Sequence, residues 1–131
     1  MTLSDIKQWF LNNNQSRDSL LPGGALPYKV YTALLTQSGT DDPVAIVLEN
    51  TLGGVVVWTR QAAGYYWGVL NGTFPRNKTI CIGNSYSGTV NIVNDEINEP
   101  SDRILLKSKD YTGAETDGLF YLSTIEIRVY P

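Results

Sequence analysis

Hydrophobic and polar positions alternate with a period of two along most of this chain, in short segments separated by turn residues. Alternation of this kind places successive side chains on opposite faces of a strand. The candidate strands are residues 28–36, 44–48, 55–60, 64–70, 79–82, 89–93, 103–109 and 119–130. Parallel pairing needs long crossover connections, for which the intervening turns leave no room. Sandwiches and barrels share this signature, and we expect an all-β fold, an antiparallel β-sandwich (jelly-roll-like) of about eight strands.

Two connections carry strong turn signals. Asn71-Gly72 follows the candidate strand 64–70 and is the strongest short-range hairpin signal, because both residues tolerate positive φ. Residues 50–54 (NTLGG) follow the run 44–48, which is apolar throughout, and supply similar conformational freedom. We therefore expect a hairpin at Asn71-Gly72 and a tight connection at residues 50–54.

The first residues follow a helical period instead. Thr2 and Asp5 have the spacing of a capping box, in which each side chain accepts the backbone N–H of the other residue. Ile6, Trp9 and Phe10 follow at i, i+3 and i+4, which predicts a short apolar stripe on a helix of about two turns. These three side chains are the candidate partner-binding residues.

The composition of the chain changes at about residue 27. Residues 12–16 (NNNQS) should end the helix because their side chains compete for backbone hydrogen bonds, and a polar linker with Pro and Gly follows. We expect an N-terminal helix and linker arm over residues 1–27 and a β-sandwich domain over residues 28–131. A helix this short needs a surface to dock on. That surface is either its own domain or a partner.

The composition removes most common catalytic designs. Among 131 residues there is no His and a single Cys, Cys81, which excludes His-based catalysis, Cys-His nucleophile sites, zinc clusters and intrachain disulfides. Cys81 lies between two Ile residues and should fill space as a small hydrophobic residue. The remaining carboxylates occur in polar turns, where Asp is favoured for local hydrogen bonding: Asp41-Asp42, Asp95-Glu96, Glu99 with Asp102, and Glu115 with Asp117.

These observations predict a protein that is not an enzyme and holds no cofactor. Residues 94–102 are acidic but lack the ligand spacing of an EF-hand loop, so no metal site is expected. The net charge is −3 and the ten basic residues are scattered, which argues against nucleic acid as a partner. There is no apolar run long enough to span a membrane and no secretory signal, so we expect no membrane partner and synthesis in a cytoplasm.

Tyr65, Tyr66 and Trp67 form the densest aromatic cluster. Alternation places Tyr65 and Trp67 on one face of a strand and Tyr66 on the other, so at least one face should be core. Exposed aromatic rings can also bury in a protein interface or stack on sugar rings. Core packing, an interface and a glycan contact therefore stay open for these three residues.

Several segments resemble a known group of proteins. They are residues 28–37 (YKVYTALLTQ), 43–45 (PVA), 47–54 (VLENTLGG), 57–60 (VWTR) and 123–131 (STIEIRVYP). Together they look like small, mostly uncharacterised β-rich proteins of tailed bacteriophages and related environmental viruses. The resemblance covers residues 28–131 loosely and 28–60 most closely. It rests on strands and turns, so no active-site residues carry over.

The resemblance implies an accessory component of a virion, at a tail, fibre or capsid surface, made in the cytoplasm of a bacterial host. Its expected partners are other virion proteins and further copies of itself, with a trimer as one option. The predicted function is thus a non-enzymatic structural protein that assembles through its β domain and N-terminal arm. The alternative is a carbohydrate-binding module that recognises a host-surface glycan through Tyr65, Tyr66 or Trp67.

Overall fold

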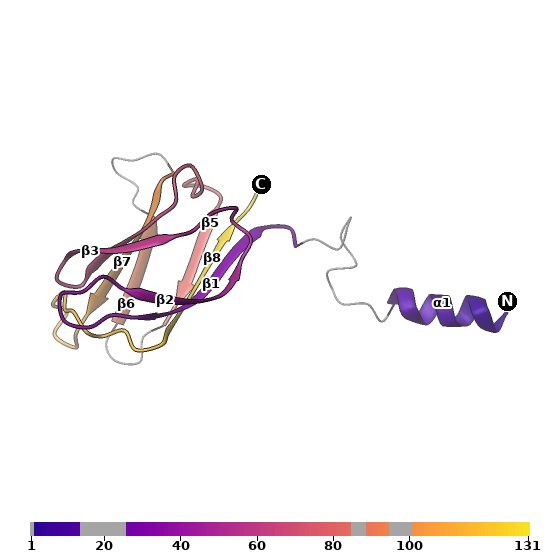
Figure 1. Cartoon of the computed structure of the whole chain (residues 1–131), viewed down its shortest axis with the longest axis horizontal. Coiled ribbons are helices and arrows are strands. Elements are labelled where there is room, and N and C mark those ends of the chain that lie inside the picture. The colour runs from indigo at the N-terminus through magenta and orange to yellow at the C-terminus, as the bar shows by residue number, and fades with distance from the viewer. Residues whose placement is uncertain (1, 14–25, 85–88, 95–100) are drawn as a thin grey trace.

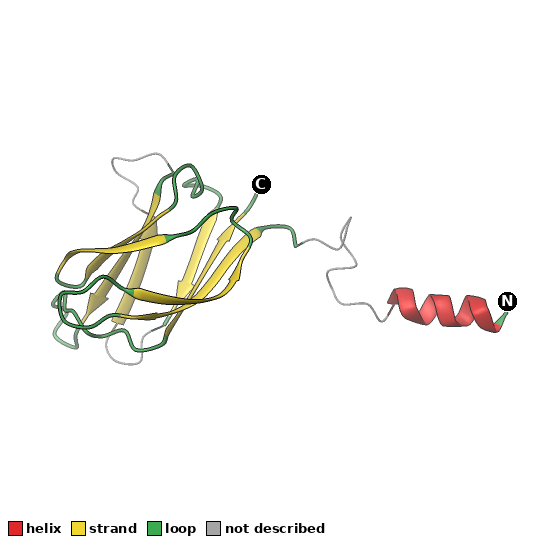
Figure 2. Cartoon of the chain, in the orientation of Figure 1, coloured by secondary structure: helices red, strands yellow, loops and turns green. Residues whose placement is uncertain are grey.

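The structure is a computed structural model of the chain. It describes residues 2–13, 26–84, 89–94 and 101–131, and for residues 9–13 and 89–94 the backbone alone. One helix and eight strands make up the regular structure (Figures 1 and 2). The strands form two antiparallel sheets, which confirms the predicted all-β antiparallel architecture.

Helix α1 spans Leu3–Asn13 and begins with the predicted capping box. The Asp5 N–H donates to Thr2 Oγ1 at 3.2 Å, and the Thr2 N–H donates to Asp5 Oδ2 at 2.8 Å. These bonds satisfy donors that the first turn of a helix leaves without partners. The helix is longer than the two turns expected, because it includes Asn12 and Asn13. It lies apart from the sheets (Figure 1).

The eight strands divide into two four-stranded sheets. The first sheet has the order β2-β1-β8-β5, and the second sheet has the order β3-β4-β7-β6. Their bounds are β1 Lys29–Thr36, β2 Val44–Asn50, β3 Val57–Ala62, β4 Tyr65–Val69, β5 Thr79–Gly83, β6 Thr89–Asn94, β7 Arg103–Lys109 and β8 Ser123–Val129. The last strand begins later than expected, and β2 extends two residues further because Glu49 and Asn50 pair with β1 across a bulge.

The core lies between the two sheets and follows the period of the strands. On β1 and β8 the pairs Tyr31–Ile127 and Ala33–Ile125 are buried, while the alternate residues face outward. The Trp58 indole N–H donates to the Tyr31 hydroxyl at 3.1 Å, which ties β3 to β1 across the core. This bond lets two large aromatic side chains be buried without leaving a polar atom unpaired.

The expected hairpin at Asn71-Gly72 is wrong. A turn does occur there, with Gly72 at φ 69°, but β4 pairs with β3 and β7, and the next strand, β5, belongs to the other sheet. Phe74 is 2% exposed, so the chain turns into the core as it crosses between the sheets. The dipeptide fixes a turn geometry, whereas burial of Phe74 decides where the chain goes next.

Gly64, in the turn between β3 and β4, tests how closely this turn approaches the backbone of Ser108 and Thr116. Its φ is +64°, and an added Cβ would lie 2.5 Å from the carbonyl oxygen of Ser108 and 2.5 Å from the backbone nitrogen of Thr116. Gly64→Ala should therefore lower the free energy of unfolding by more than about 3 kcal/mol, from left-handed strain together with overlap. Urea denaturation of the full chain measures this.

The matched control is Gly113→Ala. Gly113 has φ +86° but no atom within 4 Å of an added Cβ, so only the backbone strain of about 1–2 kcal/mol applies. Equal losses in the two variants would contradict the close approach at Gly64.

Candidate functional site

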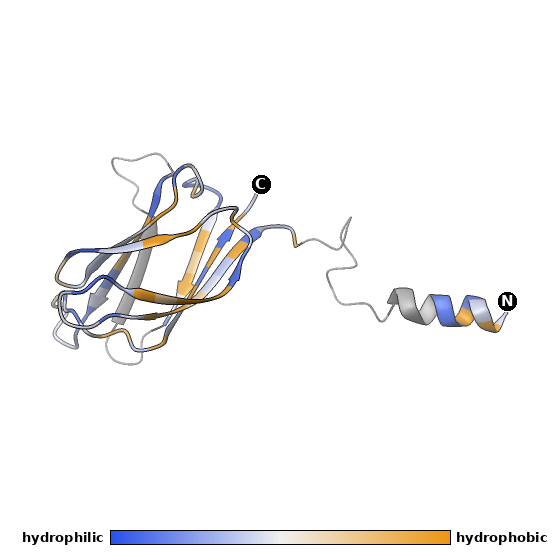
Figure 3. Ribbon diagram, viewed as in Figure 1, coloured by the Kyte–Doolittle hydropathy of each residue, from blue (hydrophilic) through white to orange (hydrophobic). Residues whose placement is uncertain are grey.

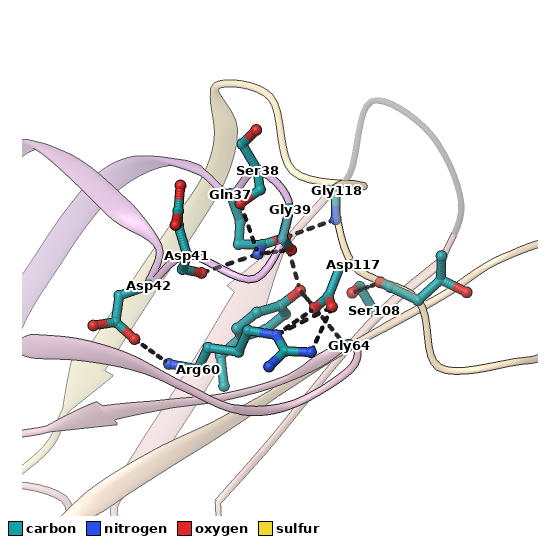
Figure 4. Close-up of polar contacts among 12 residues, drawn as sticks. Gln37, Ser38, Gly39, Asp41, Asp42, Arg60, Gly64, Ser108, Asp117 and Gly118 are labelled. Carbon is teal, nitrogen blue, oxygen red and sulfur yellow. Dashed lines mark hydrogen bonds and ion pairs between the residues drawn. The ribbon is translucent and has the colours of Figure 1, made fainter.

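An ion pair of Arg60 and Asp117 anchors the most extensive polar cluster that the structure describes (Figure 4). Arg60 Nη2 donates to Asp117 Oδ2 at 2.8 Å, and Arg60 Nε lies 3.1 Å from both carboxylate oxygens. The Gly64 N–H also donates to Asp117 Oδ1, at 3.0 Å. The planar guanidinium matches the carboxylate, and the pair joins β3 to the loop before β8.

Gln37 forms the second half of this cluster and is 3% exposed. Its Nε2 donates to the carbonyl oxygens of Gly39 at 2.8 Å and Asp41 at 3.0 Å. Its Oε1 accepts the Gly118 N–H at 2.6 Å and lies 3.0 Å from the hydroxyl of Tyr66. One buried side chain therefore closes the loop after β1 and fastens it to the loop before β8.

The electrostatics of the cluster keep its groups in fixed protonation states. The Arg60 guanidinium, followed by the Gly64 N–H and Tyr66, lowers the pKa of Asp117 to about 2 despite partial burial. Burial, and then the hydrogen bond to Asp117 at 2.8 Å, raise the pKa of Tyr66. An acid or base catalyst needs a pKa near the working pH, so this arrangement holds loops in place rather than transfers protons.

Two of the other predicted turn carboxylates bind backbone groups of distant segments: Asp42 Oδ1 accepts the Arg60 N–H at 2.7 Å, and Asp102 Oδ1 accepts the Gly72 N–H at 2.9 Å. Glu115 Oε1 lies 3.2 Å from Lys107 Nζ. Among the described residues there is no group of three or more Cys, Asp or Glu that could hold a metal ion. The candidates Asp95, Glu96 and Glu99 lie outside the described residues.

Cys81 packs against the core, as predicted for a space-filling residue. Burial raises the pKa of its thiol to about 12, so the thiol stays protonated and is a poor nucleophile.

The structure separates the aromatic residues Tyr65, Tyr66 and Trp67 as alternation predicted. Tyr66 is fully buried, so including it among the possible glycan or interface contacts was wrong. Tyr65 and Trp67 lie on the outer face of the second sheet and are half-buried. The Arg103 guanidinium lies 4.0 Å from the Trp67 ring centroid, and Lys107 Nζ lies 5.3 Å from that of Tyr65. Each ring already has a cation over one face, which a stacking sugar would have to share or displace.

The predicted partner-binding residues lie on α1. Ile6 is 39% exposed and Leu3, which the sequence analysis did not single out, is 68% exposed. Trp9 and Phe10 belong to the same helix. Every side chain from Leu3 to Gln8 is exposed, so this part of the helix is not covered by the sandwich.

The edge strands β2 and β5 of the first sheet are rich in apolar residues (Figure 3), and their outward positions carry exposed apolar side chains. On β2, Val44 is 67% and Ile46 51% exposed; on β5, Ile80 is 46% and Ile82 50% exposed. The sequence pattern of β2 contained this signal, since a run that is apolar on both faces is typical of a strand covered on both sides.

A pocket of about 800 Å³ lies where residue 26 leads into β1. Its wall includes Leu26, Tyr28 and Leu52 from one side and Pro75 and Tyr130 from the other. The rings of Tyr28 and Tyr130 lie 5.1 Å apart, and Arg128 stands over the Tyr28 ring at 4.9 Å. The pocket is largely apolar, includes Lys29 and Glu49 in its lining, and has the size of small-molecule sites.

The chain was compared with protein families, curated proteins and solved structures, and nothing in any of the three comparisons matches it. Within the described residues no helix is both long and apolar enough to cross a membrane.

The Asp117 pair predicts a specific loss of stability in acid. A carboxylate with a lower pKa in the folded than in the unfolded chain stabilises the fold while ionised. Its contribution is therefore complete above the ordinary pKa of 3.8 and disappears as the pH falls through about 2. Asp117→Asn should lower the free energy of unfolding at neutral pH by about 1–3 kcal/mol and flatten its decline in acid. Urea denaturation over this pH range measures both effects.

Asp41→Asn is the control, because Asp41 is an exposed carboxylate in the loop after β1 and joins the same cluster only through its backbone carbonyl. It should leave both the stability at neutral pH and the acid profile near those of the unmodified chain. An acid profile for Asp117→Asn as steep as that of the unmodified chain would contradict the role assigned to the ion pair.

Proposed function

We propose that the protein is a non-enzymatic structural or accessory component of a phage virion, tethered by its N-terminal arm and assembled through its β-sandwich. The observation that carries the proposal is α1, a capped helix whose apolar residues Leu3 and Ile6 stand exposed and apart from the sandwich. The sequence resemblance to β-rich phage proteins supplies the context of a virion.

The length of α1 supports a role in docking. Helices of fewer than about 12–15 residues are marginal in water, and α1 has 11 residues. The capping box of Thr2 and Asp5 stabilises only the exposed first turn, which does not by itself make such a helix stable. Burying the apolar stripe against a partner would add the missing stabilisation, so a helix with this design is suited to folding fully when it binds.

The strand order is compatible with a jelly-roll-like sandwich, the finer form of the proposal. The first and last strands, β1 and β8, pair in one sheet, and β4 pairs with β7 in the other. This nesting of early strands against late ones is how a jelly roll wraps a long antiparallel pair into two sheets. The intervening strands β2 and β3 lie at the edges, β2 in the first sheet and β3 in the second.

The composition of the surface also supports a binding role. Where the structure describes side chains, the first sheet exposes apolar residues on β2 and β5. We propose other virion proteins as the partners of the arm, since their docking surfaces for a short helix would be apolar grooves.

The test is incorporation of the full chain into phage particles. Leu3→Asp with Ile6→Asp should reduce incorporation at least tenfold, because both substitutions place charge in the apolar stripe. Lys7→Gln is the matched control, as it changes an exposed polar position of the same helix and should leave incorporation unchanged. Quantitative mass spectrometry of purified particles measures the amount.

Incorporation of the Leu3/Ile6 variant at the level of the unmodified chain would contradict the tether. Absence of the unmodified chain from particles would contradict the virion assignment itself.

A further inference from the structure

The outer face of the first sheet departs from the usual pattern of an antiparallel sandwich. Such a sheet normally buries one face and presents polar side chains on the other. The second sheet is closer to this pattern, because its outer face carries Thr59, Lys107 and Lys109 beside its two aromatic rings, although Val57 at its edge is 55% exposed. The first sheet departs from it further, because both β2 and β5 present apolar side chains to solvent.

The register shows how the apolar residues are arranged on this face. Ile46 pairs with Leu34 and Val44 with Thr36 at one flank, on β2 and β1. Ile80 pairs with Arg128 at the other flank, on β5 and β8. The apolar side chains thus form two rows along the edges of the face, roughly three strand spacings or ~15 Å apart, and exposed Glu49 lies beyond the β2 row, opposite Thr32.

The centre of the face carries one charge of each sign. Arg128 Nη2 lies 2.8 Å from Glu126 Oε2, and the two side chains are 33% and 27% exposed. Thr32 beside them donates its hydroxyl to Glu126 Oε1 at 3.4 Å. Apolar rows on both flanks with a plus–minus pair between them make a surface that is complementary to itself, because a second copy offers apolar rows and the opposite charge at each central position.

We infer that this face, defined by Val44, Ile46, Ile80, Ile82, Glu126 and Arg128, binds a second copy of the chain. The inference deepens the proposed function, on which it rests, by naming the surface through which the β-sandwich assembles. These six side chains come from three of the four strands of the sheet, and contiguous exposed patches with apolar character mark interaction sites on proteins. Pairing two such faces would place the apolar flanks out of water and leave the ion pairs in contact across the interface.

The first experiment measures the mass of the full chain in solution by sedimentation over a range of concentrations. The unmodified chain should form an oligomer, and Ile46→Glu with Ile80→Lys should raise its dissociation constant at least tenfold. Val55→Glu is the matched control, because Val55 is 76% exposed but lies outside this face, in the connection before β3. It should leave the dissociation constant unchanged.

Charges placed in strands can also lower the stability of the fold, so a second variant that introduces no charge is measured as well. Ile46→Thr with Ile80→Thr keeps β-branched side chains, which strands favour, and should still raise the dissociation constant about threefold or more. Thermal unfolding of each variant confirms that the sandwich is intact under the conditions of the sedimentation measurement.

A charge exchange tests whether the partner is a second copy. Arg128→Glu makes the centre of the face wholly acidic, and Glu126→Arg makes it wholly basic, so each variant alone should self-associate at least tenfold more weakly. Mixed together, the two variants should bind each other with an affinity near that of the unmodified chain, because each supplies the charge that the other lacks. Differently tagged chains show this directly.

A monomeric unmodified chain, or a mixture that fails to recover binding, would overturn the inference. If the face variants instead lose incorporation into particles while the unmodified chain is monomeric, another virion protein covers the face. Failure of the proposed function looks different: the chain would oligomerise through this face and yet be absent from particles.

Discussion

A strand presents side chains to two faces, and a sandwich of two sheets covers only one face of each sheet. This constraint organises the whole structure. Tyr31, Ala33 and Ile127 fill the covered side, and the central pair of β1 with β8 holds them there. The second sheet meets the constraint with cations and aromatic rings on its outer face. The first sheet meets it only on the inside, so the exposed valines and isoleucines of β2 and β5 are the consequence that bears on function.

The two ends of β1 have different roles. At its C-terminal end, Gln37 and the Arg60–Asp117 pair join three loops through hydrogen bonds, and the pKa values of this cluster do not suit proton transfer. At its N-terminal end the chain continues toward the arm, beside the pocket at Tyr28 and Tyr130. The eight residues of β1 separate these ends by roughly 25 Å. The arm is therefore attached far from the Gln37 and Arg60–Asp117 contacts that hold the loops.

A β-sandwich that is stabilised by its own core and by the Gln37 and Arg60–Asp117 contacts can use its remaining surfaces for binding. α1 and the outer face of the first sheet both expose apolar side chains that a single copy leaves uncovered. They differ in character, since the helix is a short element on a linker of the chain, whereas the sheet face is flat and carries a balanced pair of charges. We propose that the helix engages another virion protein and the sheet face a second copy, which together describe a building block.

The sequence by itself determined what depends on neighbours along the chain. The period of two placed the strands, with β7 located at its observed bounds, and the spacing of Thr2 and Asp5 identified the capping box, because strand alternation and helix capping are local properties. Alternation also separated Tyr66 from Tyr65 and Trp67. Tertiary structure alone decided the pairing of strands, as the failed hairpin at Asn71-Gly72 shows. It also decided that Arg60 meets Asp117, 57 positions away, and that β2 and β5 share one uncovered face. Such contacts depend on which apolar surfaces bury each other, and that choice involves the whole chain at once.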